Sequence, residues 1–267
     1  MSWWGKVIGG ALGFAVSGPI GALLGAAIGH SFDKGLHGIE SMSPEDFSTE
    51  SIQAAFFTAT FSIMGRVAKS DGIVSQEEID VAQATMSRMQ LNDEQVKAAQ
   101  TLFLQGKSAS FDYRAIAQQL RQECGRRTNL LQMFLEIQIA TALADGELHN
   151  SEQAILLELA ELLGFKRQQF EQLLAMAVAQ QRFYNKDHGF SAQNSASQLE
   201  EAYDVLGLED TCSDQELKRA YRRLMSQHHP DKLVAKGLPE EMMKLATEKT
   251  QQIKEAYELV KRNRNIK

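Results

Sequence analysis

The residues with the clearest chemical potential are a histidine, a proline and an aspartate in direct succession at positions 229 to 231. Proline has a fixed φ angle and no amide hydrogen, so Pro230 cannot continue a preceding helix and forces the chain to bend. We expect the bend to present His229 and Asp231 to solvent. The helix expected before it carries four cations without an interleaved carboxylate: Lys218, Arg219, Arg222 and Arg223. Alone, this face is an ordinary solvated helix surface, but beside the tripeptide it favours a binding role.

Two acidic turns offer a second kind of chemistry. Each has an Asp-Gly pair and a glutamate seven residues after the aspartate, which gives four carboxylates: Asp71, Glu78, Asp145 and Glu152. If these groups converged, they would suit Ca²⁺. Helix capping explains them without a metal and is favoured, because Ser75 precedes Glu78 by three residues. Asn150 stands in the same relation to Gln153 in the second turn.

The remaining candidate groups give no support for an enzyme. His228 and His229 are adjacent, so they do not share a helix face and do not suggest a zinc site. Cys124 and Cys212 are far apart and lie in no Cys-x-x-Cys motif, which is typical of free thiols in a reducing compartment. The chain has no phosphate-binding loop and no nucleophile–base constellation. We therefore expect neither catalysis nor a cofactor.

Three helices are expected around the tripeptide, at about 201–206, 213–228 and 239–262. Ser213 or Asp214 can cap the second helix. Apolar side chains recur at steps of three and four in both the second and the third helix. Two amphipathic helices with facing apolar stripes are expected to pack as an antiparallel pair, with the tripeptide at the connection.

Four segments of residues 200–267 resemble the J domain in their order and spacing. They are Tyr-Asp-Val-Leu-Gly at 203–207, Lys-Arg-Ala-Tyr-Arg at 218–222, His-Pro-Asp-Lys at 229–232 and Glu-Ala-Tyr-Glu at 255–258. The resemblance implies a helical hairpin that binds an Hsp70 chaperone, DnaK in bacteria, and stimulates its ATPase. It places the contact at His229, Pro230, Asp231 and Lys232, together with the four cations of the preceding helix.

The middle of the chain, residues 48–183, has the three- and four-residue apolar period of helices, with glycines at the turns. Segment 67–78 recurs as 142–152, and both copies contain the acidic turn. This repeat resembles the TerB-like family of tellurite-resistance proteins, which implies an all-α domain. A metal- or oxyanion-responsive role for this domain, with the J domain as an accessory, is the alternative to the co-chaperone hypothesis.

The N-terminus contains an uncharged run at residues 7–29. As a helix it would be about 34 Å long, enough to cross a bilayer. Small residues recur every fourth position, which allows two membrane helices to approach closely; the glycines are Gly5, Gly9, Gly13, Gly21, Gly25 and Gly29. Three other interpretations remain open: a cleaved signal peptide, a soluble tail, and a hairpin broken at residues 17–19.

The expected fold class is all-α, with an N-terminal transmembrane helix, a TerB-like helical bundle and a C-terminal J-domain hairpin. The segments are residues 1–6 outside the membrane, 7–29 within it, a connector at 30–47, the TerB-like domain at 48–183, a linker at 184–199 and the J domain at 200–267.

This order resembles the membrane-anchored DnaJ-like co-chaperones of bacteria. The resemblance implies a single-pass inner-membrane protein with cytoplasmic domains, a homodimer formed through the membrane segment, and a link to envelope stress. The net charge of −6 argues against a nucleic-acid partner.

Overall fold

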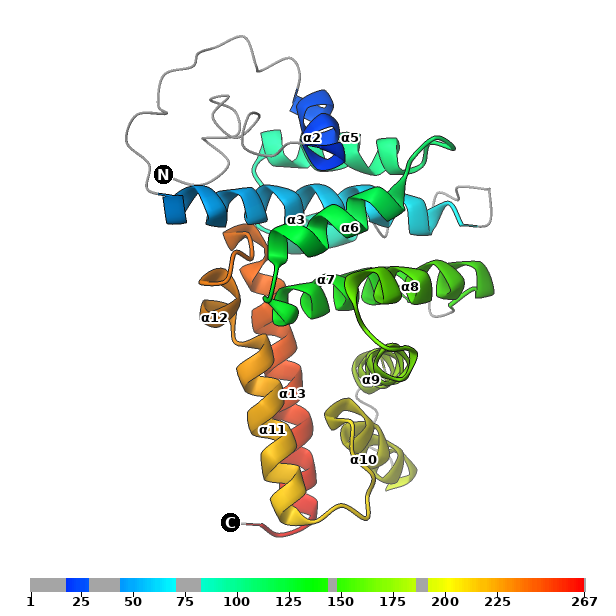
Figure 1. Ribbon diagram of the computed structural model, residues 1–267. Coiled ribbons are helices and arrows are strands. Elements are labelled where there is room, and N and C mark those ends of the chain that lie inside the picture. Colours follow the sequence, from blue (N-terminus) through cyan, green and yellow to red (C-terminus); the bar gives the residue numbers. More distant parts are fainter. Residues whose placement is uncertain (1–17, 29–43, 71–82, 144–147, 186–191, 267) are drawn as a thin grey trace.

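The structure, a computed structural model, describes residues 18–28, 44–70, 83–143, 148–185 and 192–266 (Figure 1). Regular secondary structure in these ranges is helical, as expected. The helices labelled in Figure 1 are α2 (Pro19–Ile28), α3 (Pro44–Ala68), α5 (Asp93–Gly106), α6 (Tyr113–Cys124), α7 (Thr128–Ala142), α8 (Asn150–Leu163), α9 (Arg167–Asn185), α10 (Ala192–Leu206), α11 (Asp214–His228), α12 (Pro230–Val234) and α13 (Met243–Asn263).

The TerB-like bundle is built around α3, which is buried on every side from residue 50 to residue 65. Helices α2, α5, α6 and α7 all pack against it. A helix surrounded in this way needs apolar or small residues all round rather than on one stripe, and α3 has them. Its Phe56 ring meets Phe134 of α7 edge to face, with ring centroids 5.9 Å apart.

The crossing of α3 and α5 depends on two glycines. A Cβ atom at Gly65 would lie 2.0 Å from the carbonyl oxygen of Phe103, and one at Gly106 would lie 1.8 Å from that of Ser62. Each glycine therefore lets the backbone of the other helix approach to a distance that no side chain allows. This close contact fixes the position of α5 on the central helix.

The J domain is the expected antiparallel hairpin, and α11 and α13 lie side by side in Figure 1. Ser213 caps α11, and the Glu216 side chain accepts a hydrogen bond from the Ser213 amide in return. Between the two helices the Tyr221 and Tyr257 rings stack at 4.1 Å. Helix α10 packs against both α13 and α9, so it joins the hairpin to the bundle.

Two local expectations differ from the structure. Helix α10 begins at Ala192, inside the segment expected to be a linker, and Leu199 packs against the J-domain core. The sequence from 192 to 198, Ala-Gln-Asn-Ser-Ala-Ser-Gln, has no apolar period that would predict a helix. The N-cap of α8 is His149, not Asn150, and Glu152 accepts a hydrogen bond from the His149 amide at 3.1 Å.

The N-terminal prediction is only partly covered by the described residues. Gly18 has a φ angle of +86°, so α2 begins at Pro19 and has 10 residues. Ile20 and Leu24 are buried against the bundle. None of the helices in the described ranges has the length and apolar character needed to cross a membrane. Residues 7–17 and 29 of the expected membrane helix lie outside the described residues.

We predict that Gly65→Ala destabilises the bundle by more than about 3 kcal/mol, because the new methyl group meets backbone that cannot move aside. Urea unfolding followed by circular dichroism measures the change. The control is Gln100→Ala on the exposed face of α5. Its free energy of unfolding is expected to stay within about 0.5 kcal/mol of that of the parent protein. Equal stability of Gly65→Ala and the control would contradict this packing.

Candidate functional site

The His-Pro-Asp tripeptide forms the corner between α11 and α12. His229 ends α11 and is also the N-cap of α12, with φ −58° and ψ 122°. Pro230 takes the first position of α12, where its missing amide hydrogen breaks no helical bond. The carbonyl oxygen of His229 accepts the amide of Leu233 at 3.0 Å, which closes this single turn. The bend predicted from the proline is therefore present.

The residues predicted to bind Hsp70 lie on α11 and α12, at one end of the hairpin and along its flank. Asp231 and Lys232 are exposed. We call the four cations of α11 the basic face, and all of them are exposed: Lys218, Arg219, Arg222 and Arg223. His229 was expected to point outward, but it is half-buried, and its Nδ1 is enclosed with no hydrogen-bond partner in the part of the chain that the structure describes.

The structure assigns a role to His228 that the sequence did not predict. Its side chain is 2% exposed, and its Nε2 lies 3.0 Å from both carboxylate oxygens of Glu136 on α7. Its Nδ1 lies 2.9 Å from the carbonyl oxygen of Leu224. Both ring nitrogens thus face acceptors, so the geometry suits an imidazolium that donates two hydrogen bonds.

Glu136 is the centre of a buried charge cluster, which we define as Glu136, His228 and Lys249. The Lys249 Nζ lies 3.1 Å from the Glu136 carboxylate, and Gln132 donates to the same carboxylate at 2.8 Å. Burial alone would raise the pKa of Glu136. The charges of His228 and Lys249, with the hydrogen bonds from His228 and Gln132, outweigh burial and lower the pKa below its ordinary value of 4.5.

Apolar contacts hold the same end of the hairpin against the bundle. Residues of α12, of the following loop and of the start of α13 belong to the core cluster of the TerB-like domain; they are Leu233, Leu238, Met242, Leu245 and Ala246. A Cβ at Gly237, whose φ is +105°, would lie 2.7 Å from the Ile52 side chain of α3. Figure 1 shows α12 next to one end of α3, while the opposite end of the hairpin projects away.

Polar contacts surround this apolar contact between the hairpin and the bundle, which we call the junction. Gln95 of α5 donates to the Glu241 carboxylate at 2.5 Å, and the Gln90 amide donates to the Glu241 carbonyl at 3.2 Å. Arg88 and Glu248 form an ion pair at 2.6 Å. The residues that place the tripeptide therefore come from both domains.

The other predicted site residues are less fully covered. Of the four carboxylates considered for a metal, Glu152 lies at the start of α8, and Asp71, Glu78 and Asp145 lie outside the described residues. The described ranges contain no group of three or more residues arranged to hold a metal ion. Of the glycines expected on the membrane dimer face, Gly21 and Gly25 lie on α2 and the others lie outside the described residues.

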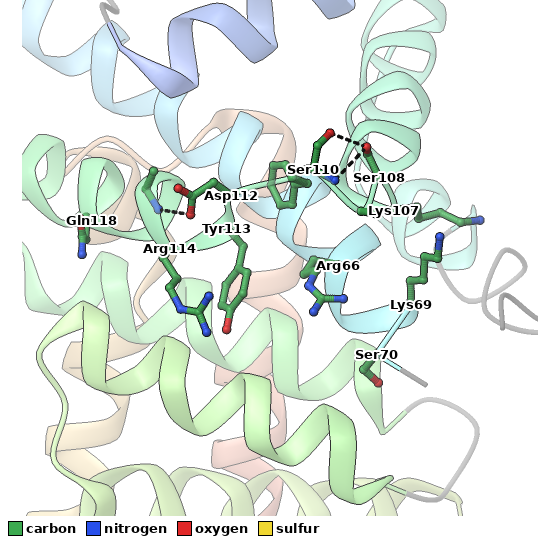
Figure 2. Close-up of a pocket in the computed structure, with 13 residues that line it drawn as sticks. Arg66, Lys69, Ser70, Lys107, Ser108, Ser110, Asp112, Tyr113, Arg114 and Gln118 are labelled. Carbon is green, nitrogen blue, oxygen red and sulfur yellow. Dashed lines mark hydrogen bonds between the residues drawn. The ribbon is translucent and has the colours of Figure 1, made fainter. Parts of the chain in front are cut away.

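A cavity of about 830 Å³ opens where α3 and α5 end and α6 begins (Figure 2). Arg66 and Lys69 at the end of α3 and Lys107 at the end of α5 line it. The carbonyl ends of helices carry partial negative charge, which these cations complement. Their presence therefore has a structural explanation, and we assign this cavity no function.

We predict that Glu136→Gln lowers the free energy of unfolding by about 3 kcal/mol at neutral pH, because it leaves the buried His228 and the partly buried Lys249 facing a neutral amide in place of a carboxylate. Folding lowers the pKa of Glu136, so the unfolded chain takes up this proton first as the pH falls. The contribution of the ionised Glu136 to the free energy of unfolding is therefore complete above pH 4.5, and it is lost progressively as the pH falls below that value. Urea titrations of both proteins from about pH 7 to about pH 3 measure it; a difference that does not shrink at low pH would contradict the pairing.

Three parts of the chain match known families. Residues 1–39 match the co-chaperone DjlA transmembrane domain, residues 57–175 match tellurite resistance protein TerB, and residues 201–267 match the DnaJ domain. The resemblances to the J domain and to the TerB-like family are thereby confirmed. The first match indicates a membrane-anchored protein.

Relatives match over the whole chain. A co-chaperone protein DjlA of Photobacterium profundum is 43% identical over 99% of this chain and 100% of its own length. Those of Coxiella burnetii and Escherichia coli K12 are each 44% identical over the full length of both chains. No solved structure matches the chain. With this identity from end to end, the chain belongs to the family of DjlA co-chaperones.

Proposed function

We propose that this co-chaperone binds a DnaK-type Hsp70 through the basic face and the His-Pro-Asp corner, and that the contact stimulates ATP hydrolysis by the Hsp70. One observation carries the proposal. The four cations of the basic face are exposed along α11, the helix that ends at the corner, where Asp231 is also exposed. The basic face is complementary to an acidic surface on the partner. The exposed Asp231 carboxylate is complementary to a basic group at the edge of that surface.

The stimulation is an allosteric effect on the partner. A contact shifts an equilibrium only if it is stronger with one state of the partner than with the other. The basic face brings the two proteins together and fixes their register, since complementary charge mainly raises the association rate. The corner then supplies the contacts that favour the hydrolysis-competent state of the Hsp70. This mechanism requires no catalytic group from the chain itself.

The same proposal includes the setting in the cell. The anchor is the segment that matches the DjlA transmembrane domain, and we place it in the inner membrane with the TerB-like and J domains in the cytoplasm, where DnaK acts. The stripe of small residues in this segment supports a homodimer. Such a protein would direct Hsp70 to the membrane, in keeping with a role in envelope stress.

We predict that His229→Gln lowers the stimulation of DnaK by about 10–30-fold, as expected when a central contact residue is lost. Single-turnover ATP hydrolysis with the detergent-solubilised full chain measures it. His149→Gln is the matched control, because His149 is exposed and lies on α8, away from the corner. Stimulation by the His229 variant that equals the control would refute the assigned role of the corner.

We also predict that Arg222→Glu with Arg223→Glu slows association with DnaK by about 10–100-fold, and that the effect weakens as salt is added. Stopped-flow fluorescence at several salt concentrations measures the rate. Arg126→Glu changes charge at another exposed position and should have little effect. If both variants bind equally fast at low salt, the basic face does not guide the encounter.

A further inference from the structure

The TerB-like domain covers the end of the hairpin that carries the His-Pro-Asp corner. We call this region, residues 228–246, the loop end. His228 inserts into the bundle to reach Glu136, and the apolar residues after the corner join the bundle core. At the corner itself, His229 is half-buried and its Nδ1 is enclosed. The residues on both sides of His229 are thus held against the bundle, and the His229 ring itself is only partly accessible to a partner.

We propose that the TerB-like domain and Hsp70 compete for the loop end, so that the docked arrangement restrains the co-chaperone and undocking activates it. This inference rests on the proposed function. It adds a role for the TerB-like domain, which is to act as an intramolecular ligand of the J domain.

The docked surface has the features of an evolved interface. It combines a buried charge cluster, an apolar contact and a polar rim. Gly237 has a backbone conformation that favours glycine and lies against Ile52, so the loop is shaped to fit α3. Asn129 of α7 also donates to the Gln227 carbonyl, the backbone position just before His228, at 3.4 Å. Both sides of the corner are thus held.

The docked state also keeps one polar group unsatisfied. The buried His229 Nδ1 has no hydrogen-bond partner among the described residues. A buried polar atom without a partner is costly, so a change that opens the corner to water or to a partner's donor is favourable at this atom.

A second core closes the hairpin away from the loop end. It includes Leu217, Leu224, Ile253 and Val260, and it also takes in α10 together with Met176 and Ala179 of α9. Undocking removes contacts of the loop end but leaves this second core in place. The hairpin is therefore expected to keep its fold when the loop end leaves the bundle.

Two full-length variants test the inference in opposite directions. Glu136→Lys places a cation opposite His228 and Lys249 and should undock the loop end without changing any residue proposed to bind Hsp70. To lock the domains, Arg88→Cys and Glu248→Cys replace a rim ion pair and are joined by a cleavable bis-maleimide. Cys212→Ser removes the other accessible thiol, whereas burial raises the pKa of the Cys124 thiol to about 12 and keeps it unreactive.

The readout is single-turnover ATP hydrolysis by DnaK at subsaturating co-chaperone. The Glu136→Lys variant should stimulate up to about tenfold more than the parent, because apparent affinity scales with the fraction of competent molecules. The cross-linked protein should lose most of its stimulation and regain it when the linker is cleaved. Circular dichroism of the Glu136→Lys variant checks its fold, and the linker experiment does not depend on that variant.

Full stimulation by the cross-linked protein would overturn the inference, because it would show that the docked arrangement is competent. That result would leave the proposed function intact if His229→Gln still abolished the effect. Absence of stimulation in every form, cleaved and uncleaved, would reject the proposed function and this inference together.

Discussion

A single buried carboxylate organises the end of the hairpin that carries the His-Pro-Asp corner. Glu136 belongs to the TerB-like domain, and it pairs with His228 and Lys249 of the J domain. A buried ion pair gains little unless its hydrogen bonds are complete, and here Gln132 supplies a further donor. Because His228 immediately precedes the His-Pro-Asp tripeptide, this pairing determines how the corner lies relative to the bundle.

The arrangement separates two properties of the J domain. The basic face of α11 is exposed, so the charge proposed to attract an acidic partner is available in this arrangement. His229 at the corner is only half exposed, so the contact proposed to change the partner's state is less accessible. Under the proposal, association with the partner and activation of the partner can be controlled independently. The long loop between α12 and α13 contributes to this separation, since its apolar residues pack on the TerB-like domain rather than within the hairpin.

The features predicted well from the sequence are those that depend on neighbouring residues. The bend at Pro230, the cap at Ser213 and the apolar stripes of α11 and α13 all follow from local spacing. The exposed position of the basic face follows from the same helical period. These patterns need no knowledge of the distant chain.

The junction could not be predicted, because its partners are distant in the sequence and have no distinctive pattern. Glu136 stands in a strongly apolar helix, 92 positions before His228, and nothing local marks it as a partner of a histidine. His228 was likewise assigned no role from the sequence, because its partner lies on a distant helix. The start of α10 was missed because its polar residues resemble a linker until α9 and α13 are present to cover Leu199.

The most direct test of this account is a double-mutant cycle between Glu136→Gln and His228→Gln, with the free energy of unfolding measured for the four proteins at neutral pH. If the two side chains form the buried pair that holds the corner, the cycle will give a coupling of about 1.5–3 kcal/mol. A coupling close to zero would mean that the two side chains act independently, and the docked arrangement would then lose its physical basis.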